Sequence, residues 1–401
     1  NGPSHSSSYR RHFPYSGGCV YDTTLLGSEL ENMKRIKEYL DKTEMDTLNR
    51  TFTKWNLENL KEEQIIRIGE GAWHTVYKIE KLDDRDLVIR IKKNKAYGEL
   101  QPIDEIELTT EYESTKAYYS NVNESNRDVC PTFYQYFIEN DIVFTVETFM
   151  GHGTDLLSLH KDEANSYGKQ LGRIYHRIHN NKTSMEGFGE LDWNGKTLRG
   201  SDFNNIDALW QEENNQILIA LSTLVHSGLH FDKEKVDTYI SSLIENRRTQ
   251  IQKIALVNQD VTPENLILTG DHIAIIDPFP RLDFDLKYAA YFVFCYKFLL
   301  PAFSNAPRYI KHAYEEKSSI LNEIADGFIN GYFFDLDEDE FITQSRRLMD
   351  EYTLWLLQEA YEHYEILQQP HLNSKTTQQM GDREMITARL HLCLAELEKW
   401  C

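Results

Sequence analysis

The sequence predicts an α+β protein of two lobes, in which a small N-terminal antiparallel β-sheet with one helix precedes a larger, mainly helical lobe. Three observations lead to this expectation. Short β-branched or alternating segments, which are typical of strands, are concentrated between residues 64 and 147. From residue 162 onward, apolar residues recur mainly at the spacing of amphipathic helices. One strand pair at residues 255–277 interrupts those helices and carries several polar side chains.

The first lobe is expected at residues 61–150, after an N-terminal extension over residues 1–60. The extension begins with a Ser- and Gly-rich segment and should continue as a helix over residues 24–50. The lobe itself should contain five strands and one helix, separated by turn-rich segments. The expected strands cover residues 64–68, 75–80, 87–92, 132–139 and 141–147, and the helix covers residues 104–119.

The second lobe is expected at residues 151–401 and should contain the strand pair and a set of amphipathic helices. A chain of 401 residues is long enough to bury a large core and to divide into two domains. Helical spacing of apolar residues is found near residues 162–180, 203–226, 232–253, 284–300, 308–331, 338–368 and 382–399.

The charge balance disfavours some classes of partner. The chain has 43 Lys and Arg residues against 64 Asp and Glu residues, which gives a formal net charge of -21. Such a field repels nucleic acids and anionic membrane surfaces and attracts cations. We therefore expect no nucleic-acid and no membrane partner, whereas a metal–nucleotide complex or a cationic small molecule fits. The alternative is that the acidic excess serves solubility alone.

The cysteines indicate a reducing compartment. They are odd in number and widely spaced, and they form no Cys-x-x-Cys pair: Cys19, Cys130, Cys295, Cys393 and Cys401. This pattern argues against a disulfide framework and against a structural zinc site. We therefore expect a cytoplasmic protein, and no apolar run in the sequence reaches the length of a membrane span. The sequence carries no indication of the oligomeric state.

The strongest chemical signal is a group of three polar residues around the predicted strand pair. Asn265 directly precedes the outgoing strand and Asp277 directly follows the returning one, so a hairpin brings both side chains to the same end. Asp260 lies on the loop just upstream. Two carboxylates and one carboxamide at one place suit Mg²⁺, with one carboxylate left for acid–base work. The alternative is that Asp260 and Asn265 only cap the loop through local hydrogen bonds.

This spacing resembles the catalytic loop of the aminoglycoside phosphotransferase-like kinases, which are small-molecule relatives of the protein kinases. The resemblance covers about residues 65–300. It implies a bilobal, protein-kinase-like fold that uses Mg²⁺ and ATP or GTP, with Asp260 as the catalytic base and Asn265 and Asp277 as metal ligands. Two positions depart from the family pattern: Asn258 replaces the usual His, and Pro278 and Phe279 follow Asp277 in place of Phe-Gly. The second departure favours a small-molecule kinase over a regulated protein kinase.

Two further motifs suggest where a nucleotide would bind. Gly69 and Gly71 lie between strands and would let the backbone fold over phosphates, although any hairpin could hold such a pair. Arg90 and Lys92 share one face of a predicted strand, where kinases place the cation that holds the α- and β-phosphates. The resemblance favours Arg90, and Lys92 is the alternative. Both residues could also be solvent-facing edge charges.

The resemblance also implies a partner for that cation and a contact for the base. A phosphate-binding cation needs a carboxylate, and the family's helix position points to Glu111, with Glu107 as its rival. The segment containing Glu147 and Phe149 resembles the hinge, whose backbone contacts the nucleotide base in kinases. Backbone contacts leave little side-chain pattern, so the sequence does not distinguish ATP from GTP.

In this family the late helices of the second lobe form the wall of the acceptor site. Here these helices are rich in acidic and aromatic residues, among them the acidic run 332–340 and Glu351, Trp355, Glu359 and Tyr361. Carboxylates and rings suit a cationic acceptor, such as an aminoglycoside or a similar antibiotic. The alternatives are a kinase of choline, a sugar amine or an amino alcohol, and an inactive kinase fold that only binds a partner.

Overall fold

Five of the described strands form the sheet of the small lobe, in the order β1-β2-β3-β7-β6, and all neighbouring pairs are antiparallel. The computed structural model describes residues 42–401 except 56–59, 61–63, 72, 83–84, 97–98, 101, 140–141, 156–157 and 271. The strands are β1 (Ile65–Glu70), β2 (His74–Leu82), β3 (Arg85–Lys92), β6 (Tyr134–Glu139) and β7 (Ile142–Thr148). Each of the five predicted strands is therefore present, with its ends moved by at most two residues. A two-residue pair, β4 (Lys95–Ala96) and β5 (Glu99–Leu100), follows β3.

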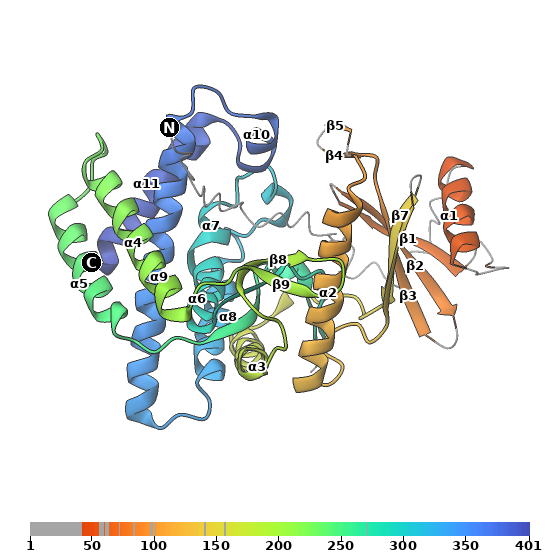
Figure 1. Ribbon diagram of the computed structural model, residues 1–401, viewed down its shortest axis with the longest axis horizontal. Helices are drawn as coiled ribbons and strands as arrows, with labels where there is room; N and C mark the ends of the chain where they lie inside the picture. Colours follow the sequence, from red (N-terminus) through yellow and green to blue (C-terminus); the bar gives the residue numbers. More distant parts are fainter. Residues whose placement is uncertain are drawn as a thin grey trace.

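Helix α1 (Lys42–Lys54) covers one face of this sheet, as Figure 1 shows at the right. Its Leu48 and Phe52 pack with Tyr77 and Ile89 of the sheet in one apolar core. The end of the predicted N-terminal extension is thus part of the small lobe. Residues 24–41 of the helix predicted over 24–50 lie outside the described residues.

Helix α2 (Glu105–Ser125) links the two lobes. It begins at Asp104, whose carboxylate accepts hydrogen bonds from the N–H groups of Ile106 and Glu107 at 3.0 Å each. The helix is one and a half turns longer than predicted at its C-terminal end. There Tyr118, Tyr119 and Val122 enter the main core of the large lobe. The helix therefore carries side chains of the small lobe into the region where the lobes meet.

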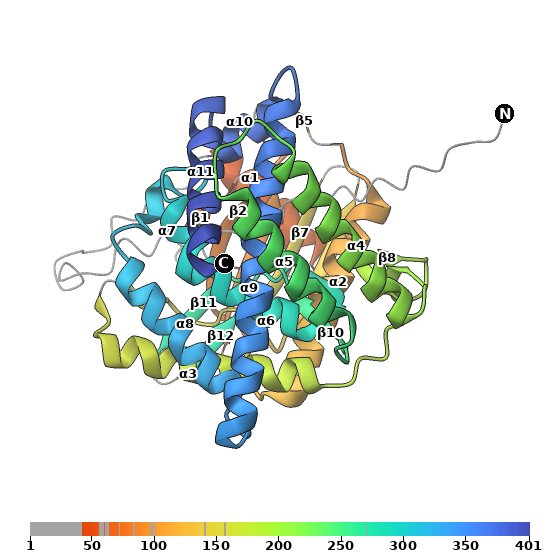
Figure 2. The same ribbon diagram turned by 90° about the vertical axis from the view of Figure 1, so that its left-hand side faces the viewer.

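The described part of the large lobe is mainly helical, as predicted (Figures 1 and 2). The α-helices are α3 (Lys161–Asn180), α4 (Ile206–Val225), α5 (Lys233–Arg248), α6 (Asp285–Phe294), α7 (Leu300–Ala302), α8 (Ser318–Tyr332), α9 (Glu338–Gln368), α10 (Ser374–Met380) and α11 (Arg383–Trp400). A π-helical turn, Cys295–Leu299, joins α6 to α7. The predicted helix over 308–331 starts ten residues late, because Ala313 has the left-handed φ of +49° and interrupts it.

The predicted strand pair is a hairpin of β11 (Leu266–Thr269) and β12 (His272–Ile275), preceded by β10 (Ile254–Asn258). Three strands were not predicted: β8 (Phe188–Trp193), β9 (Leu198–Asp202) and β13 (Pro280–Phe284). They form a sheet with β10 in the order β10-β13-β8-β9. Their signal in the sequence is weak, because they contain glycines or several charged residues, and β13 pairs with β10 and β8, which are distant along the chain.

Two pairs of glycines bring α3 and α8 into backbone contact. A Cβ atom on Gly168 of α3 would lie 2.0 Å from the Ile324 carbonyl oxygen of α8, and one on Gly327 of α8 would lie 2.0 Å from the Asn165 oxygen of α3. Gly172 and Gly331, four residues further along each helix, make equally close approaches. Both views place the two helices side by side, near the β11–β12 hairpin in Figure 2. The close approach fixes α3 beside the loop that carries the candidate catalytic residues.

In the described part of the chain, no helix combines the length and the apolarity that crossing a membrane would require.

Candidate active site

The loop after β10 holds the predicted catalytic base. Asp260 is 2% exposed, and its Oδ1 accepts hydrogen bonds from the Thr262 hydroxyl at 2.9 Å and from the Thr262 N–H at 3.3 Å. A single 3₁₀ turn, Pro263–Asn265, then leads into β11. The Thr262 hydroxyl fixes the orientation of the carboxylate, through local hydrogen bonds of the kind that the sequence analysis gave as the alternative role of Asp260.

Asn258 supports this loop at the position where the family pattern has His. Its Nδ2 donates to the Asp260 carbonyl oxygen at 2.8 Å. Its Oδ1 accepts from the N–H groups of Asp260 at 3.0 Å and Phe279 at 2.8 Å. One buried carboxamide thus ties the Asp260 loop to the segment that follows Asp277. With Asn258 in place of the family's His, the Asp260 loop is still supported by a side chain.

The hairpin brings Asn265 and Asp277 together, as the sequence pattern predicted. The Ile276 N–H donates to the Asn265 carbonyl oxygen at 3.0 Å, and Asn265 Nδ2 lies 3.5 Å from the Asp277 carbonyl oxygen. Asp277 has a φ of +48°, in the left-handed region that few residues other than glycine adopt. An isolated residue in this region is frequent at functional sites, because the surrounding structure must hold it there.

The chemistry of these side chains fits a hard cation such as Mg²⁺. Asn265 Oδ1 is buried and accepts no hydrogen bond from any described residue, and the Asp277 side chain is 35% exposed. Among the described residues, no group of three or more His, Cys, Asp or Glu side chains is arranged to hold a metal. A cation at Asn265 and Asp277 would therefore need phosphate oxygens and water to complete its coordination shell, which is how proteins usually hold Mg²⁺.

The partner of the strand cation is not the predicted one. Arg90 of β3 is buried, and its Nε and one terminal nitrogen donate to Glu147 Oε1 at 3.0 and 2.7 Å. Its other terminal nitrogen lies 3.6 Å from Asp277 Oδ2. Glu147 takes the place expected for Glu111 because Val88 is its cross-strand neighbour in β3, two residues from Arg90. The Glu147 side chain therefore points toward Arg90 at the inner face of the sheet, whereas the base contact predicted for this segment is one that its backbone would make.

Glu111 of α2 lies near Lys92 and Asp277: burial raises the pKa of its carboxyl group to about 7, Lys92 opposes this shift, and Asp277 and Glu107 reinforce it. Lys92 shares a face of β3 with Arg90, as predicted, and its Nζ lies 5.0 Å from the centre of the Trp73 ring. Arg90 is thus fixed by the sheet next to Asp277, and Lys92 lies closer to the loop between β1 and β2, which contains Gly71.

Tyr119 of α2 was missed by the sequence pattern. Its hydroxyl donates to Glu147 Oε2 at 3.0 Å and accepts the Asp277 N–H at 3.1 Å. A tyrosine inside an amphipathic helix reads as an ordinary core residue. Only the tertiary structure shows that its hydroxyl lies between Glu147, the partner of Arg90, and the backbone of Asp277.

The loop between β1 and β2 contains Gly69 and Gly71. The Gly71 N–H donates to the His74 carbonyl oxygen at 2.9 Å, and Lys93 Nζ donates to the Gly71 carbonyl oxygen at 2.9 Å. A bulge between Arg67 and Gly69 bends β1 here. His74 was not predicted as a site residue. Burial lowers the pKa of His74 to about 3; the charge of Asp277 opposes this shift and the charge of Arg90 reinforces it. His74 therefore lies near both of these site residues.

Apolar side chains from both lobes meet beyond Arg90. Val76 and Val88 of the small lobe pack with Ile68 and Phe149, and Ile68, Phe149 and Met150 also contact the hairpin residues Ile267, Ala274 and Ile276. Lys78 Nζ lies 4.5 Å from the centre of the Phe149 ring. The Phe149 N–H donates to the Asp86 carbonyl oxygen at 3.0 Å, so the side chain of Phe149, and not its amide, faces this site.

Most of the acidic and aromatic residues predicted to line an acceptor site are engaged elsewhere. Glu351 is buried and pairs with Arg247 at 2.6 Å. Tyr332 packs against His179, and its hydroxyl lies 2.9 Å from His179 Nδ1. Figure 1 shows the α8–α9 turn, which contains residues 333–337, at the lower edge of the large lobe and away from the small-lobe sheet. The acidic run 332–340 is therefore not beside the nucleotide region.

Glu359 is the exception. It is 7% exposed on α9, and its charge acts on Cys295 and Tyr309, on which the Asp260 charge also acts. Burial raises the pKa of Glu359 to about 8; Glu362 reinforces this shift, and Arg308 and Arg389 oppose it. Four residues earlier on the same helix, Trp355 packs against Tyr291 with ring centres 4.7 Å apart. Glu359 and Asp260 thus share Cys295 and Tyr309 as neighbours in the large lobe.

The architecture is shared with solved small-molecule kinases. The aminoglycoside phosphotransferase APH(4)-Ia superposes with a TM-score of 0.50 and 12% identity, over 89% of this chain and 99% of that one. A thermostable mutant of the same enzyme, in a ternary complex with AMP-PNP and hygromycin B, gives a TM-score of 0.50 at 12% identity over 88% and 98% of the two chains. The fold is that of the aminoglycoside phosphotransferases.

An ethanolamine kinase of Plasmodium vivax has 14% identity and a TM-score of 0.48, with 90% of this chain and 91% of that one covered. No protein-family model and no curated protein sequence matches the chain. The kinase-like fold expected from the catalytic-loop pattern is thus confirmed by structure, at sequence identities too low to transfer a substrate.

Proposed function

We propose that this protein is a phosphotransferase that moves the γ-phosphate of a Mg²⁺-bound nucleotide to a hydroxyl group of a small molecule. The observation that carries the proposal is the convergence of Asp260, Asn265, Asp277 and Arg90 where the two lobes meet. The contact of Arg90 with Asp277 joins the small lobe to the metal loop. A kinase needs these groups together, since phosphoryl transfer depends mainly on positioning and charge stabilisation.

Each residue has a distinct role in this proposal. Asp260 orients the acceptor hydroxyl and accepts its proton, with Thr262 holding the carboxylate at 2.9 Å. Asn265 and Asp277 hold the cation, which when bound neutralises charge on the phosphates. Arg90 positions the α- and β-phosphates, and Gly69 and Gly71 cover them. Burial of Arg90 against Glu147 supports choosing it over Lys92.

The apolar side chains of Val76, Val88, Ile68 and Phe149, which pack toward the hairpin, support a purine base in this region. We propose ATP or GTP as the donor. Hydrogen bonds from a hinge backbone would distinguish the two bases, and the amide of Phe149 is already used within the sheet. The described thiols of Cys130, Cys295, Cys393 and Cys401 are free, which supports a reducing, cytoplasmic location.

For the acceptor, we propose a cationic molecule, either an amine-bearing antibiotic or an amino alcohol such as choline. Glu359 and the rings of Trp355 and Tyr291 support it, because a carboxylate and aromatic faces together bind ammonium groups. The net charge of -21 adds a long-range attraction for such a substrate.

The test of the function is phosphate transfer from Mg·ATP and from Mg·GTP to a panel of aminoglycosides, choline, other amino alcohols and neutral sugars. We expect turnover with at least one cationic acceptor and with one or both nucleotides. Turnover with neutral sugars alone would contradict the cationic acceptor and leave the transferase proposal standing. A chain that binds neither nucleotide would instead be an inactive kinase fold that serves as a binding module.

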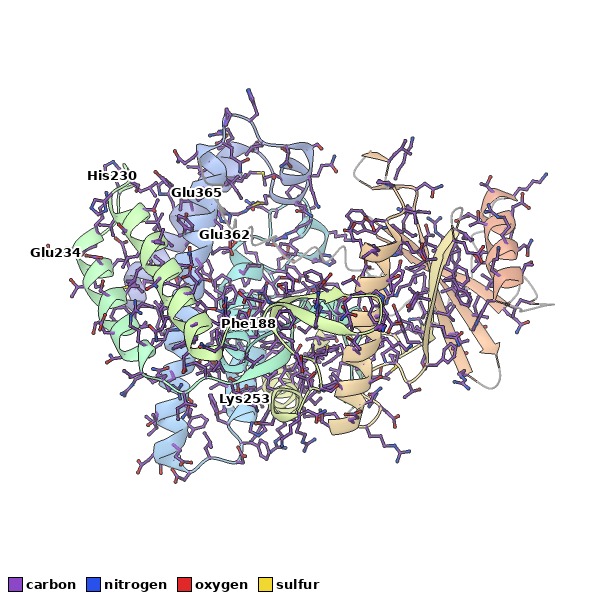
Figure 3. All side chains as sticks on the ribbon, in the orientation of Figure 1. Phe188, His230, Glu234, Lys253, Glu362 and Glu365 are labelled. Atoms are coloured by element: carbon purple, nitrogen blue, oxygen red, sulfur yellow. The ribbon has the colours of Figure 1, made fainter. Side chains whose placement is uncertain are left out.

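Glu359 provides a pH test of the acceptor proposal. Because its pKa is raised to about 8, the carboxyl group is mainly protonated below that pH and charged above it. Choline keeps its charge at every pH, so its KM should fall by about tenfold between pH 7 and pH 9 as the fraction of charged carboxylate rises. Glu359→Gln should abolish this change. Glu365→Gln is a matched control, since Glu365 is exposed on the same helix in Figure 3. A wild-type KM that does not vary with pH would exclude Glu359 from the acceptor site.

A further inference from the structure

Four residues, from β3, β7, α2 and the loop after β12, form a closed chain of contacts between the two lobes. Arg90 of β3 donates twice to Glu147 Oε1 of β7, and Glu147 Oε2 accepts from the Tyr119 hydroxyl of α2. The Tyr119 oxygen in turn accepts the Asp277 N–H, and Asp277 Oδ2 lies 3.6 Å from Arg90. Arg90, the proposed phosphate-binding cation, and Asp277, a proposed metal ligand, are therefore joined through the Tyr119 hydroxyl group.

The direction of each hydrogen bond in this chain is determined. Carboxylate oxygens only accept, so Tyr119 must donate its proton to Glu147. The lone pairs of the Tyr119 oxygen are then left to receive the Asp277 N–H. A hydroxyl group with both roles filled is held in one orientation, and it orients its two neighbours in return.

Asp277 needs such support because of its backbone. Its φ of +48° is an uncommon conformation for a residue other than glycine, and the Tyr119 hydroxyl accepts the N–H of that same residue. The Asp277 carboxylate follows the backbone, since only one side-chain carbon separates them. Fixing the N–H therefore also fixes where the carboxylate can point.

Protein kinases link the strand cation to a glutamate on the helix of the small lobe. In this protein the cation's carboxylate is Glu147, which belongs to the same sheet, and the helix contributes Tyr119 in place of a charge. Tyr119 of the helix therefore contacts the backbone of Asp277. Arg90 is held within the sheet by Glu147.

We infer that Tyr119 is a positioning residue that couples nucleotide phosphate binding at Arg90 to metal binding at Asp277. This inference rests on the proposed function, and it assigns a task to a residue outside the family's catalytic pattern. Removing the hydroxyl leaves Arg90 paired with Glu147, so metal-free nucleotide binding is preserved. It leaves the Asp277 N–H without its acceptor, so the contribution of the metal to nucleotide binding falls.

The experiment compares Tyr119→Phe with the wild-type chain by calorimetric titration of AMP-PNP, once with MgCl₂ and once with EDTA. We expect the affinity in EDTA to stay within about twofold and the enhancement by Mg²⁺ to fall by about fivefold, the size of one hydrogen bond between neutral groups. The free Mg²⁺ concentration that gives half-maximal transfer should rise by the same factor.

Tyr118→Phe is the matched control. The neighbouring Tyr118 is fully buried, and its hydroxyl has no hydrogen-bond partner among the described residues. Removing that hydroxyl should change neither titration. Thermal unfolding of both variants establishes that they are folded, and the ratio of affinities with and without Mg²⁺ does not depend on a modest loss of stability.

The outcomes separate the inference from the proposed function. Equal Mg²⁺ enhancement in Tyr119→Phe and wild type would overturn the role of Tyr119 and leave the phosphotransferase proposal intact. An equal fall in Tyr118→Phe would show a packing effect and would also overturn it. A wild-type chain whose nucleotide binding does not respond to Mg²⁺ would overturn both.

Discussion

Replacing Asp260 with asparagine is expected to reduce phosphate transfer by about a thousandfold, while the affinity for the Mg²⁺-bound nucleotide stays within a few-fold. Asparagine keeps the size of the side chain and can still accept the hydrogen bond from Thr262 at Oδ1. It cannot accept the proton of the acceptor hydroxyl. The loss should therefore appear in kcat, measured with the acceptor that gives the highest turnover.

Asp192→Asn is the control for this variant, because Asp192 lies exposed on β8 and should leave kcat unchanged. If Asp260→Asn retained more than about a tenth of the wild-type kcat, Asp260 would not be the base. If nucleotide binding were lost as well, the residue would support the loop rather than the transfer step.

The largest effect on stability is expected at the contact between α3 and α8. A Cβ on Gly327 would lie 2.0 Å from the Asn165 carbonyl oxygen and 2.9 Å from the Lys169 nitrogen. These are backbone atoms of a packed helix, so no side-chain rotation can relieve the overlap and the helices must separate. We expect Gly327→Ala to lower the free energy of unfolding by about 3 kcal/mol or more, measured by urea denaturation.

Gly228→Ala provides the comparison. A Cβ on Gly228 would meet nothing within 4 Å, and its backbone is compatible with alanine. This substitution should be neutral or stabilise the protein by about 0.5 kcal/mol, since it restricts the unfolded chain. Equal unfolding free energies for the two variants would show that α3 and α8 are not in backbone contact in solution.

The strands of the small lobe and the hairpin around Asn265 and Asp277 could be predicted because their signals are local. Alternating or β-branched residues define each strand, and the hairpin turn fixes which ends meet. The helix of residues 308–331 was predicted too long, because apolar spacing does not reveal a single left-handed residue such as Ala313. Strands β8, β9 and β13 were missed, because glycines or charged residues weaken their alternation and because β13 pairs with strands that are distant in the sequence.

The same distinction separates the correct from the incorrect expectations at the site. Asp260, Asn265 and Asp277 belong to one continuous segment, and their proximity follows from the hairpin. The partner of Arg90 does not follow from a local segment, because it depends on which strand lies beside β3. The sheet order places Glu147 there, whereas the predicted Glu111 belongs to α2 and lies near Lys92 and Asp277.

The sequence by itself determined the two-lobe α+β organisation, the hairpin and the three polar residues that it gathers, because each follows from residues close together along the chain. Only the tertiary structure decided that Glu147 holds Arg90, that Tyr119 reaches Asp277, and that Glu351 pairs with Arg247 while Glu359 shares neighbours with Asp260. The hydrogen-bonded pairs among them join residues from 57 to 158 positions apart. Their formation depends on how whole helices and strands pack, which local sequence patterns do not encode.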